Sequence, residues 1–148
     1  MRFFALTLML SAFSLVSYGQ KDIDPSAVPN VVKDAFKVEF ADATDVEWEL
    51  KDNHYEAEFE VNDTDYHALL DTSGKIISHK QEIEESELPA EVLTAIQNDF
   101  SDYKVDDAEK LMKDGEIYYQ VELEKFLSDQ EKVFSETGEI RDDISYWN

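Results

Sequence analysis

Two periodicities of apolar and polar residues run along the chain, and each predicts one kind of element. Apolar residues recur at steps of three and four over 28–40 and 88–100, which predicts two amphipathic helices. Pro29 and Pro89 fall in the first turn of these helices, where proline is tolerated. Strict alternation follows, most clearly over 55–61, and predicts antiparallel strands with one apolar face. The pattern therefore predicts a helix followed by strands, twice over.

The two halves of the chain are copies of one unit, with short insertions in the second copy. The matched positions are Pro29 with Pro89, Phe40 with Phe100, Tyr55 with Tyr119, Lys51-Asp52 with Lys113-Asp114, and Ile76 with Ile140. Each unit is predicted to hold four strands, the last of them over about 75–81 and 139–146. A single unit would be marginally stable alone, which favours a shared sheet.

The predicted fold is α+β, with two tandem helix-plus-four-stranded-antiparallel-sheet repeats that share one sheet and place both helices on one face. Four segments are expected along the chain. They are a signal peptide over 1–19, an N-terminal lead-in over 20–27, a first repeat over 28–83 and a second repeat over 84–148.

The first residues are typical of a secretory signal peptide. Arg2 precedes an apolar stretch, and small residues at Ser17 and Gly19 predict cleavage before Gln20. The stretch is shorter than the roughly 20 residues that a membrane-spanning helix needs. We therefore expect a periplasmic or secreted protein with no membrane span after cleavage.

Charge and composition exclude several classes of function. The net charge of -22 repels nucleic-acid phosphates and anionic lipids, so neither is an expected partner. The chain has no cysteine, which excludes disulfides, zinc thiolates and a thiol nucleophile. No nucleophile motif, phosphate-binding loop or metalloprotease motif is present either. We expect a protein that is not an enzyme and needs no cofactor.

Metal binding has two candidate sites in the sequence. His67 and His79 would face each other across a hairpin if a three-residue loop joined their strands, although a two-residue loop would separate them. Asn62–Asp65 offers oxygen ligands at a turn, but no EF-hand loop is completed there. We predict no metal site, and we favour the interpretation that the two histidines are surface residues that lie there by coincidence.

Glutamates on the polar side of the predicted strands form the candidate binding surface. If the helices cover the apolar face of the sheet, these side chains project together from the opposite face. The candidate protein-binding residues are Glu47, Glu49, Glu56, Glu58, Glu60, Gln120, Glu122 and Glu124. Such a surface would attract a basic protein patch, whereas the alternative is a sheet face that is merely solvated.

Several stretches resemble the PepSY-like, beta-lactamase-inhibitor-like family of exported bacterial proteins of the Bacteroidetes type. They are VPNVVKDAFKVEFADATDVEWEL, YEAEFE, LLDTSGKI and SELPAEVLTAIQNDF, and the resemblance covers about residues 27–141. It implies a fold similar to that of a secreted beta-lactamase inhibitor, whose open sheet face binds an enzyme. One departure is that Lys110 is aligned with Trp48 of the first copy.

Together these observations predict an exported, non-catalytic protein-binding module that uses an open acidic sheet face. The resemblance adds an inhibitor role to this expectation, and the expected partner is an envelope or secreted protein. The alternative function is an acidic periplasmic protein that binds or buffers cations.

Overall fold

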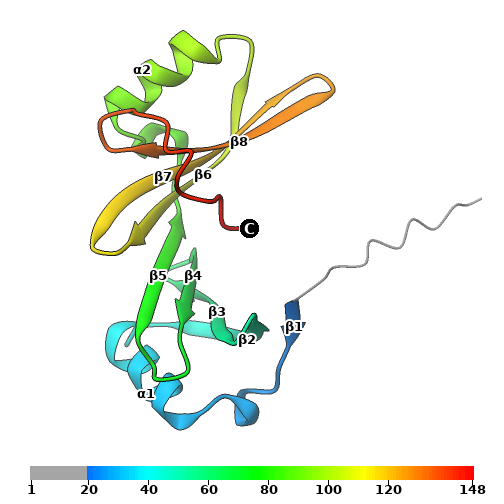
Figure 1. Cartoon of the computed structure of the whole chain (residues 1–148), viewed down its shortest axis with the longest axis vertical. Coiled ribbons are helices and arrows are strands. Elements are labelled where there is room, and N and C mark those ends of the chain that lie inside the picture. Colours follow the sequence, from blue (N-terminus) through cyan, green and yellow to red (C-terminus); the bar gives the residue numbers. More distant parts are fainter. Residues whose placement is uncertain (1–19) are drawn as a thin grey trace, which may run out of the picture.

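The computed structural model describes residues 20–148, so the predicted signal peptide lies outside the described residues (Figure 1). Eight antiparallel strands form one sheet there, and strands that follow each other along the chain are neighbours in the sheet. The strands are β1 (Gln20–Asp22), β2 (Thr44–Lys51), β3 (His54–Val61), β4 (Thr64–Leu70), β5 (Ile76–Glu82), β6 (Lys104–Lys113), β7 (Glu116–Lys125) and β8 (Ser128–Ser135). The helices are α1 (Asn30–Glu39) and α2 (Ala90–Asp99), and short 3-10 turns precede them at η1 (Pro25–Ala27) and η2 (Glu85–Glu87).

Both helices cover the same face of the sheet. In the first repeat, Val32 and Phe36 of α1 pack in a core with Phe59 of β3. In the second, α2 packs against β7 and β8 through a core that includes Val92 and Val121. The face is continuous between them, because β4, β5 and β6 align Ala68 with His79 and His79 with Met112. The predicted α+β class, with two repeats sharing one sheet and the helices on one face, is therefore confirmed.

The strand content of the two repeats differs from the prediction at both ends of the chain. Residues 20–22, expected in a lead-in, add β1 to the edge of the sheet beside β2. The predicted last strand over 139–146 is wrong, since only a single bridge between Phe134 and Ile140 forms there. The chain then turns away at Arg141 and returns to the middle of the elongated molecule, between the two repeats (Figure 1).

A longer hairpin in the second repeat explains the insertions seen in the sequence. Strands β2 and β3 have 8 residues each, whereas β6 and β7 have 10 each. The extra residues move the register, so the counterpart of Trp48 is Ala108 and the alignment with Lys110 is wrong. Trp48 pairs with Ala57 on the helix-covered face, and Ala108 pairs there with Val121.

Each repeat has a turn glycine, Gly74 or Gly138, that lets its turn pack against the helix of the same repeat. Gly74 has φ +86°, and a Cβ atom built on it would lie 2.7 Å from the Val31 carbonyl oxygen of α1. Gly138 has φ +80°, and its Cβ atom would lie 2.5 Å from the Glu91 carbonyl oxygen of α2. Only glycine accepts both the positive φ and the close approach. The repeated glycine therefore docks the end of each repeat on its own helix.

Candidate protein-binding face

The face of the sheet opposite the helices, called the open face below, carries a row of carboxylates that crosses β3 to β8. Cross-strand partners place them side by side, as Glu60 with Asp65 and Glu122 with both Asp107 and Glu131. We call this set the acidic row, and its members are Glu60, Asp65, Glu82, Asp107, Glu122 and Glu131. All six side chains are exposed or half-buried, so the row meets solvent.

Burial and neighbouring negative charges raise the pKa of two carboxyls in the acidic row. Partial burial, followed by the negative charges of Asp107 and Asp65, raises the pKa of Glu82 above its usual value. Burial, with Asp106 and Asp129 next in effect, likewise raises the pKa of Glu122. A raised carboxyl pKa means that the charged form is disfavoured where it stands. Burial therefore disfavours the charged form of both carboxyls, and neighbouring negative charges add to this effect.

The centre of the open face is a buried polar network rather than an acidic surface. Glu56 is 3% exposed, and Gln120 is 0% exposed. Lys51 Nζ lies 3.0 Å from Glu56 Oε2, and His67 Nδ1 lies 3.3 Å from Glu56 Oε1. Burial acts to raise the pKa of Glu56, but the hydrogen bonds from His67 and Lys51 outweigh it, and this pKa is lowered. Glu56 is therefore held as a carboxylate.

The second half of this network joins the two repeats. Lys80 of β5 is 4% exposed, and its Nζ lies 2.9 Å from Glu109 Oε1 of β6. Gln120 Nε2 donates to Glu109 Oε2 at 2.8 Å. A buried ammonium is tolerated when it is paired and hydrogen-bonded in this way. The network thus fixes β5, β6 and β7 to one another across the boundary between the repeats.

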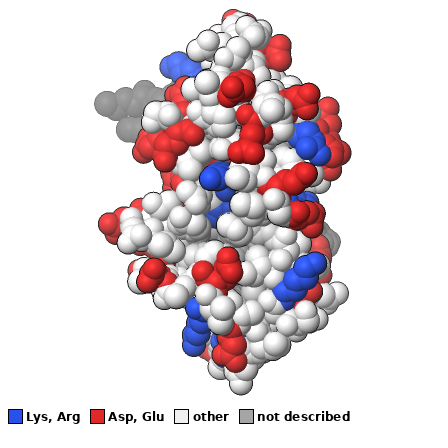
Figure 2. Space-filling model, turned by 90° about the vertical axis from the view of Figure 1, so that its left-hand side faces the viewer, with Lys and Arg blue, Asp and Glu red and all other residues white. Residues whose placement is uncertain are grey.

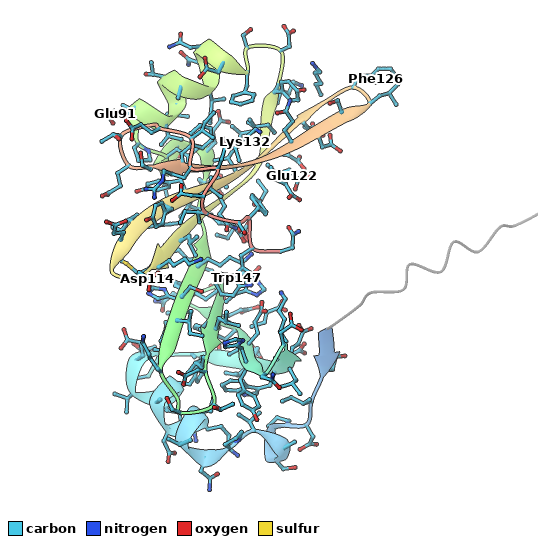
Figure 3. All side chains as sticks on the ribbon, viewed as in Figure 1. Glu91, Asp114, Glu122, Phe126, Lys132 and Trp147 are labelled. Atoms are coloured by element: carbon cyan, nitrogen blue, oxygen red, sulfur yellow. The ribbon has the colours of Figure 1, made fainter. Side chains whose placement is uncertain are left out.

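The last residues of the chain cover this central network. Ile144, Tyr146 and Trp147 pack on an apolar cluster of Leu111, Tyr118 and Val133, which lies on the open face. Figure 3 shows Trp147 between the two repeats, and Glu122 of the acidic row on β7. The open face therefore has a covered centre with the acidic row beside it, which the sequence analysis did not foresee.

The predicted binding residues divide accordingly. Glu47, Glu58, Glu60, Glu122 and Glu124 lie on the open face and reach solvent, and Glu49 lies there half-buried with an interaction of its own. Glu56 and Gln120 are instead buried in the central network.

Sequence reasoning missed other residues of the face, namely Asp65, Glu82, Asp107 and Glu131 of the acidic row, and Lys80 and Trp147 of the centre. The consecutive apolar residues Tyr118-Tyr119 and Val133-Phe134 were the available signal, because strands buried on both faces lose their alternation.

The two candidate metal-binding histidines do not face each other. A bulge at Leu69 and Leu70 shifts the register, so His67 pairs with Lys80 and lies on the open face. His79 pairs with Ala68 and lies on the helix-covered face, with its ring 5.5 Å from that of Phe40. Within residues 20–148, no group of three or more His, Cys, Asp and Glu side chains is arranged to hold a metal ion.

Acidic and basic residues are mixed on one side of the molecule. On the side of the molecule shown in Figure 2, Asp and Glu are spread from end to end with Lys and Arg among them.

Asn62 and Asp63, considered above as oxygen ligands, form a tight turn with φ values of 53° and 64°. No helix in the described part of the chain has the length and apolar character needed to cross a membrane.

Both repeats of the chain match the model of one protein family. The family described as "Putative beta-lactamase-inhibitor-like, PepSY-like" matches residues 14–78 and 72–142, one match for each repeat. This chain belongs to the PepSY-like family. Among curated proteins, no significant match was found.

Solved structures share the PepSY-like fold with this chain. A BLIP-like protein from Bacteroides fragilis is 24% identical with a TM-score of 0.68, covering 80% of this chain and 92% of its own. One of the "putative periplasmic proteins" of Bacteroides eggerthii is 20% identical with a TM-score of 0.72, covering 76% of this chain and 85% of its own. A DUF2874 family protein from Bacteroides uniformis is 22% identical with a TM-score of 0.71 at the same coverage. At these identities the likeness establishes the fold.

Proposed function

We propose that this protein is an exported, non-catalytic binding module that captures another envelope or secreted protein through the acidic row. The observation that carries the proposal is the cross-strand alignment of six carboxylates from β3 to β8 on the open face. Like charges held together on a sheet lower the stability of the free protein, and a basic surface on a partner would remove this cost. The family membership supports a binding role without catalysis.

Export follows from the predicted signal peptide, and a periplasmic neighbour of the same fold agrees with it. The inhibitor role implied by the family description is a narrower form of the same proposal. It requires that the captured partner be an enzyme, and it is tested by assaying that enzyme with and without this protein.

The test is a capture experiment with residues 20–148 immobilised and an envelope and secreted extract of the source organism passed over at physiological salt. The proposal predicts one or a few proteins retained in stoichiometric amounts, identified by mass spectrometry. Capture only at low salt, spread over many basic proteins, would contradict it, because nonspecific charge attraction is screened at physiological ionic strength.

Two charge reversals sharpen the experiment. Glu122→Lys places a cation in the acidic row, where it relieves repulsion, so the variant should fold at least as well as the wild type. Asp99→Lys makes the same change in net charge at the exposed end of α2, away from the open face. Loss of the partner with Glu122→Lys and retention with Asp99→Lys is the expected result. Equal capture by both variants would remove the acidic row from the proposal.

A further inference from the structure

Residues 145–148 lie on the open face without belonging to the sheet. In the described part of the chain, the last backbone–backbone hydrogen bond runs from the Ile144 amide to the Arg141 carbonyl, at 3.1 Å. Arg141 itself stacks over the ring of Tyr118 at 5.1 Å and binds both carboxylate oxygens of Asp143. Beyond this point the segment is held by side chains of the sheet, in the way that a bound peptide would be.

Gln120 recognises the backbone of this segment. The Trp147 amide donates to Gln120 Oε1 at 2.9 Å, and Gln120 Nε2 donates to the Trp147 carbonyl at 3.1 Å. A single buried side-chain amide thereby replaces the pair of hydrogen bonds that a neighbouring strand would offer. Because only backbone groups are read, any extended segment could form this pair.

Two lysines, from β5 and β2, complete the recognition of the backbone. Lys80 Nζ donates to the Trp147 carbonyl at 2.6 Å, and Lys51 Nζ donates to the Asn148 carbonyl at 2.7 Å. Both ammonium groups also have a carboxylate within 3.0 Å, from Glu109 and Glu56 respectively. Since these carboxylates remain when the segment leaves, the lysines keep a charge partner and can be hydrated. Release of the segment therefore leaves no buried charge without a partner.

The indole of Trp147 supplies the side-chain contacts. Lys80 Nζ lies 5.3 Å from the centre of its ring, and the ring of His67 lies 6.3 Å away at a steep angle. Its Nε1 is buried and has no hydrogen-bond partner. A cavity of about 360 Å³ lies between the segment and the sheet, where its lining includes Leu69, Ile77 and Leu111 together with Lys51 and Lys113. Space thus remains beside the segment, and one polar group of Trp147 is unmatched.

We propose that the centre of the open face is a binding site for an extended peptide segment that carries a tryptophan, and that residues 144–148 are its resident ligand. Gln120, Lys80 and Lys51 bind the backbone of the ligand, and the apolar cluster beneath binds its aromatic side chains. The site rests on the proposed function only in placing a partner on the open face, and it does not depend on the acidic row. A partner segment of this chemistry would have to displace residues 144–148.

Residues 144–148 already occupy the site, so an external peptide must compete with them. A tethered ligand acts at an effective concentration in the millimolar range, so a weak external peptide cannot compete with it at micromolar concentration. Removing the aromatic anchors of the resident segment should open the site without touching the residues that form it. This separates the site from its occupant in an experiment.

The test uses residues 20–148 with Tyr146→Ala and Trp147→Ala together, and a fluorescein-labelled peptide of residues 143–148 as the probe. The proposal predicts saturable binding of the probe to this double alanine variant, and binding at least tenfold weaker to the wild type. Adding Gln120→Met, which keeps the volume and removes the amide, should weaken binding at least tenfold. A probe with alanine in place of its tryptophan should also bind at least tenfold more weakly.

A second measurement needs no substitution. Wild-type protein labelled with ¹⁵N shows the indole N–H signals of its 2 tryptophans, Trp48 in the core and Trp147 on the open face. Unlabelled peptide at millimolar concentration should shift the Trp147 signal and leave that of Trp48 in place. No shift, together with no probe binding by a folded double alanine variant, would overturn this site. Partner capture through the acidic row would then stand on its own, because that experiment uses other residues.

Discussion

The side-chain amide of Gln120 forms hydrogen bonds with both backbone polar groups of Trp147, at 2.9 and 3.1 Å, although the two residues are 27 positions apart. Gln120 is 0% exposed, although it lies on β7 at the face of the sheet that the helices leave uncovered. This pair is what closes the centre of the open face. It also joins the end of the chain to a strand of the second repeat.

Replacing Gln120 should therefore loosen the C-terminal segment and cost stability. We expect Gln120→Met to lower the free energy of unfolding by about 1–3 kcal/mol, because the Trp147 amide and carbonyl lose a buried partner. Denaturant unfolding measures this change. Gln97→Met on the exposed surface of α2 is the matched control and should stay within about 0.5 kcal/mol of the wild type. Equal effects of the two substitutions would show that the Gln120 pair contributes nothing.

The loss of stability on replacing a turn glycine should depend on whether a helix packs against that turn. Gly74→Ala and Gly138→Ala force a Cβ atom against a helix carbonyl and into a positive φ, so each should destabilise the protein by well over 1 kcal/mol. Gly115 has φ +81° with nothing within 4 Å of its Cβ position, so Gly115→Ala should cost only the conformational penalty. Thermal unfolding of the three variants compares them. A Gly115→Ala variant as unstable as the other two would contradict the packing role.

The acidic row should make stability depend on pH in a defined direction. The raised pKa of Glu122 means that its charged form is disfavoured in the folded chain, so stability falls as pH rises through that pKa. We expect Glu122→Gln to raise the melting temperature at about pH 7 and to give no such gain below about pH 4, where the carboxyl is protonated in both states.

Glu56 supplies the opposite control for this pH dependence. Its pKa is lowered by His67 and Lys51 against the effect of burial, so its stabilising contribution is present at neutral pH and is lost as pH falls through the folded pKa. Glu56→Gln should therefore lower the melting temperature at about pH 7. Changes of the same sign in both variants at neutral pH would contradict the opposite pKa shifts of Glu122 and Glu56.

The turn between β7 and β8 carries two exposed apolar side chains. Phe126 and Leu127 are 92% and 90% exposed, and Figure 3 shows Phe126 at the tip, away from the body of the molecule. Leu127 has φ +65°, a conformation that favours glycine or asparagine. Leu127→Asn should raise the free energy of unfolding by up to about 1 kcal/mol. Phe126→Asn relieves no positive φ and should leave it unchanged, as denaturant unfolding would show.

Much of the fold was predictable because local patterns agree with it. The apolar steps that form α1 and α2, and the alternation of β3, each specify one buried face. The repeated glycine also predicted the turns, since Gly74 and Gly138 both take positive φ. What the local pattern could not supply was the contact of that glycine with a helix, which depends on tertiary packing.

The misplaced features have identifiable physical causes. One bulge at Leu69 and Leu70 turned His79 to the helix-covered face, because a shift of one residue exchanges the two faces of a strand. The segment over 139–146 alternates only in part, since Arg141, Asp142 and Asp143 are consecutive, and Ile144 and Tyr146 pack half-buried on the open face instead of extending the sheet. The strand pattern predicts Glu56 and Gln120 at the surface, because it does not predict that residues 144–147 cover this face.

The most direct test of the acidic row is the association rate of the captured partner, measured against ionic strength for the wild type, Glu122→Lys and Asp99→Lys. Opposite charges on two surfaces speed their encounter, and salt screens this effect. We predict a slower association and a flatter salt dependence for Glu122→Lys, with Asp99→Lys close to the wild type. Identical rates and salt dependence for all three proteins would contradict the claim that the partner meets the open face through its carboxylates.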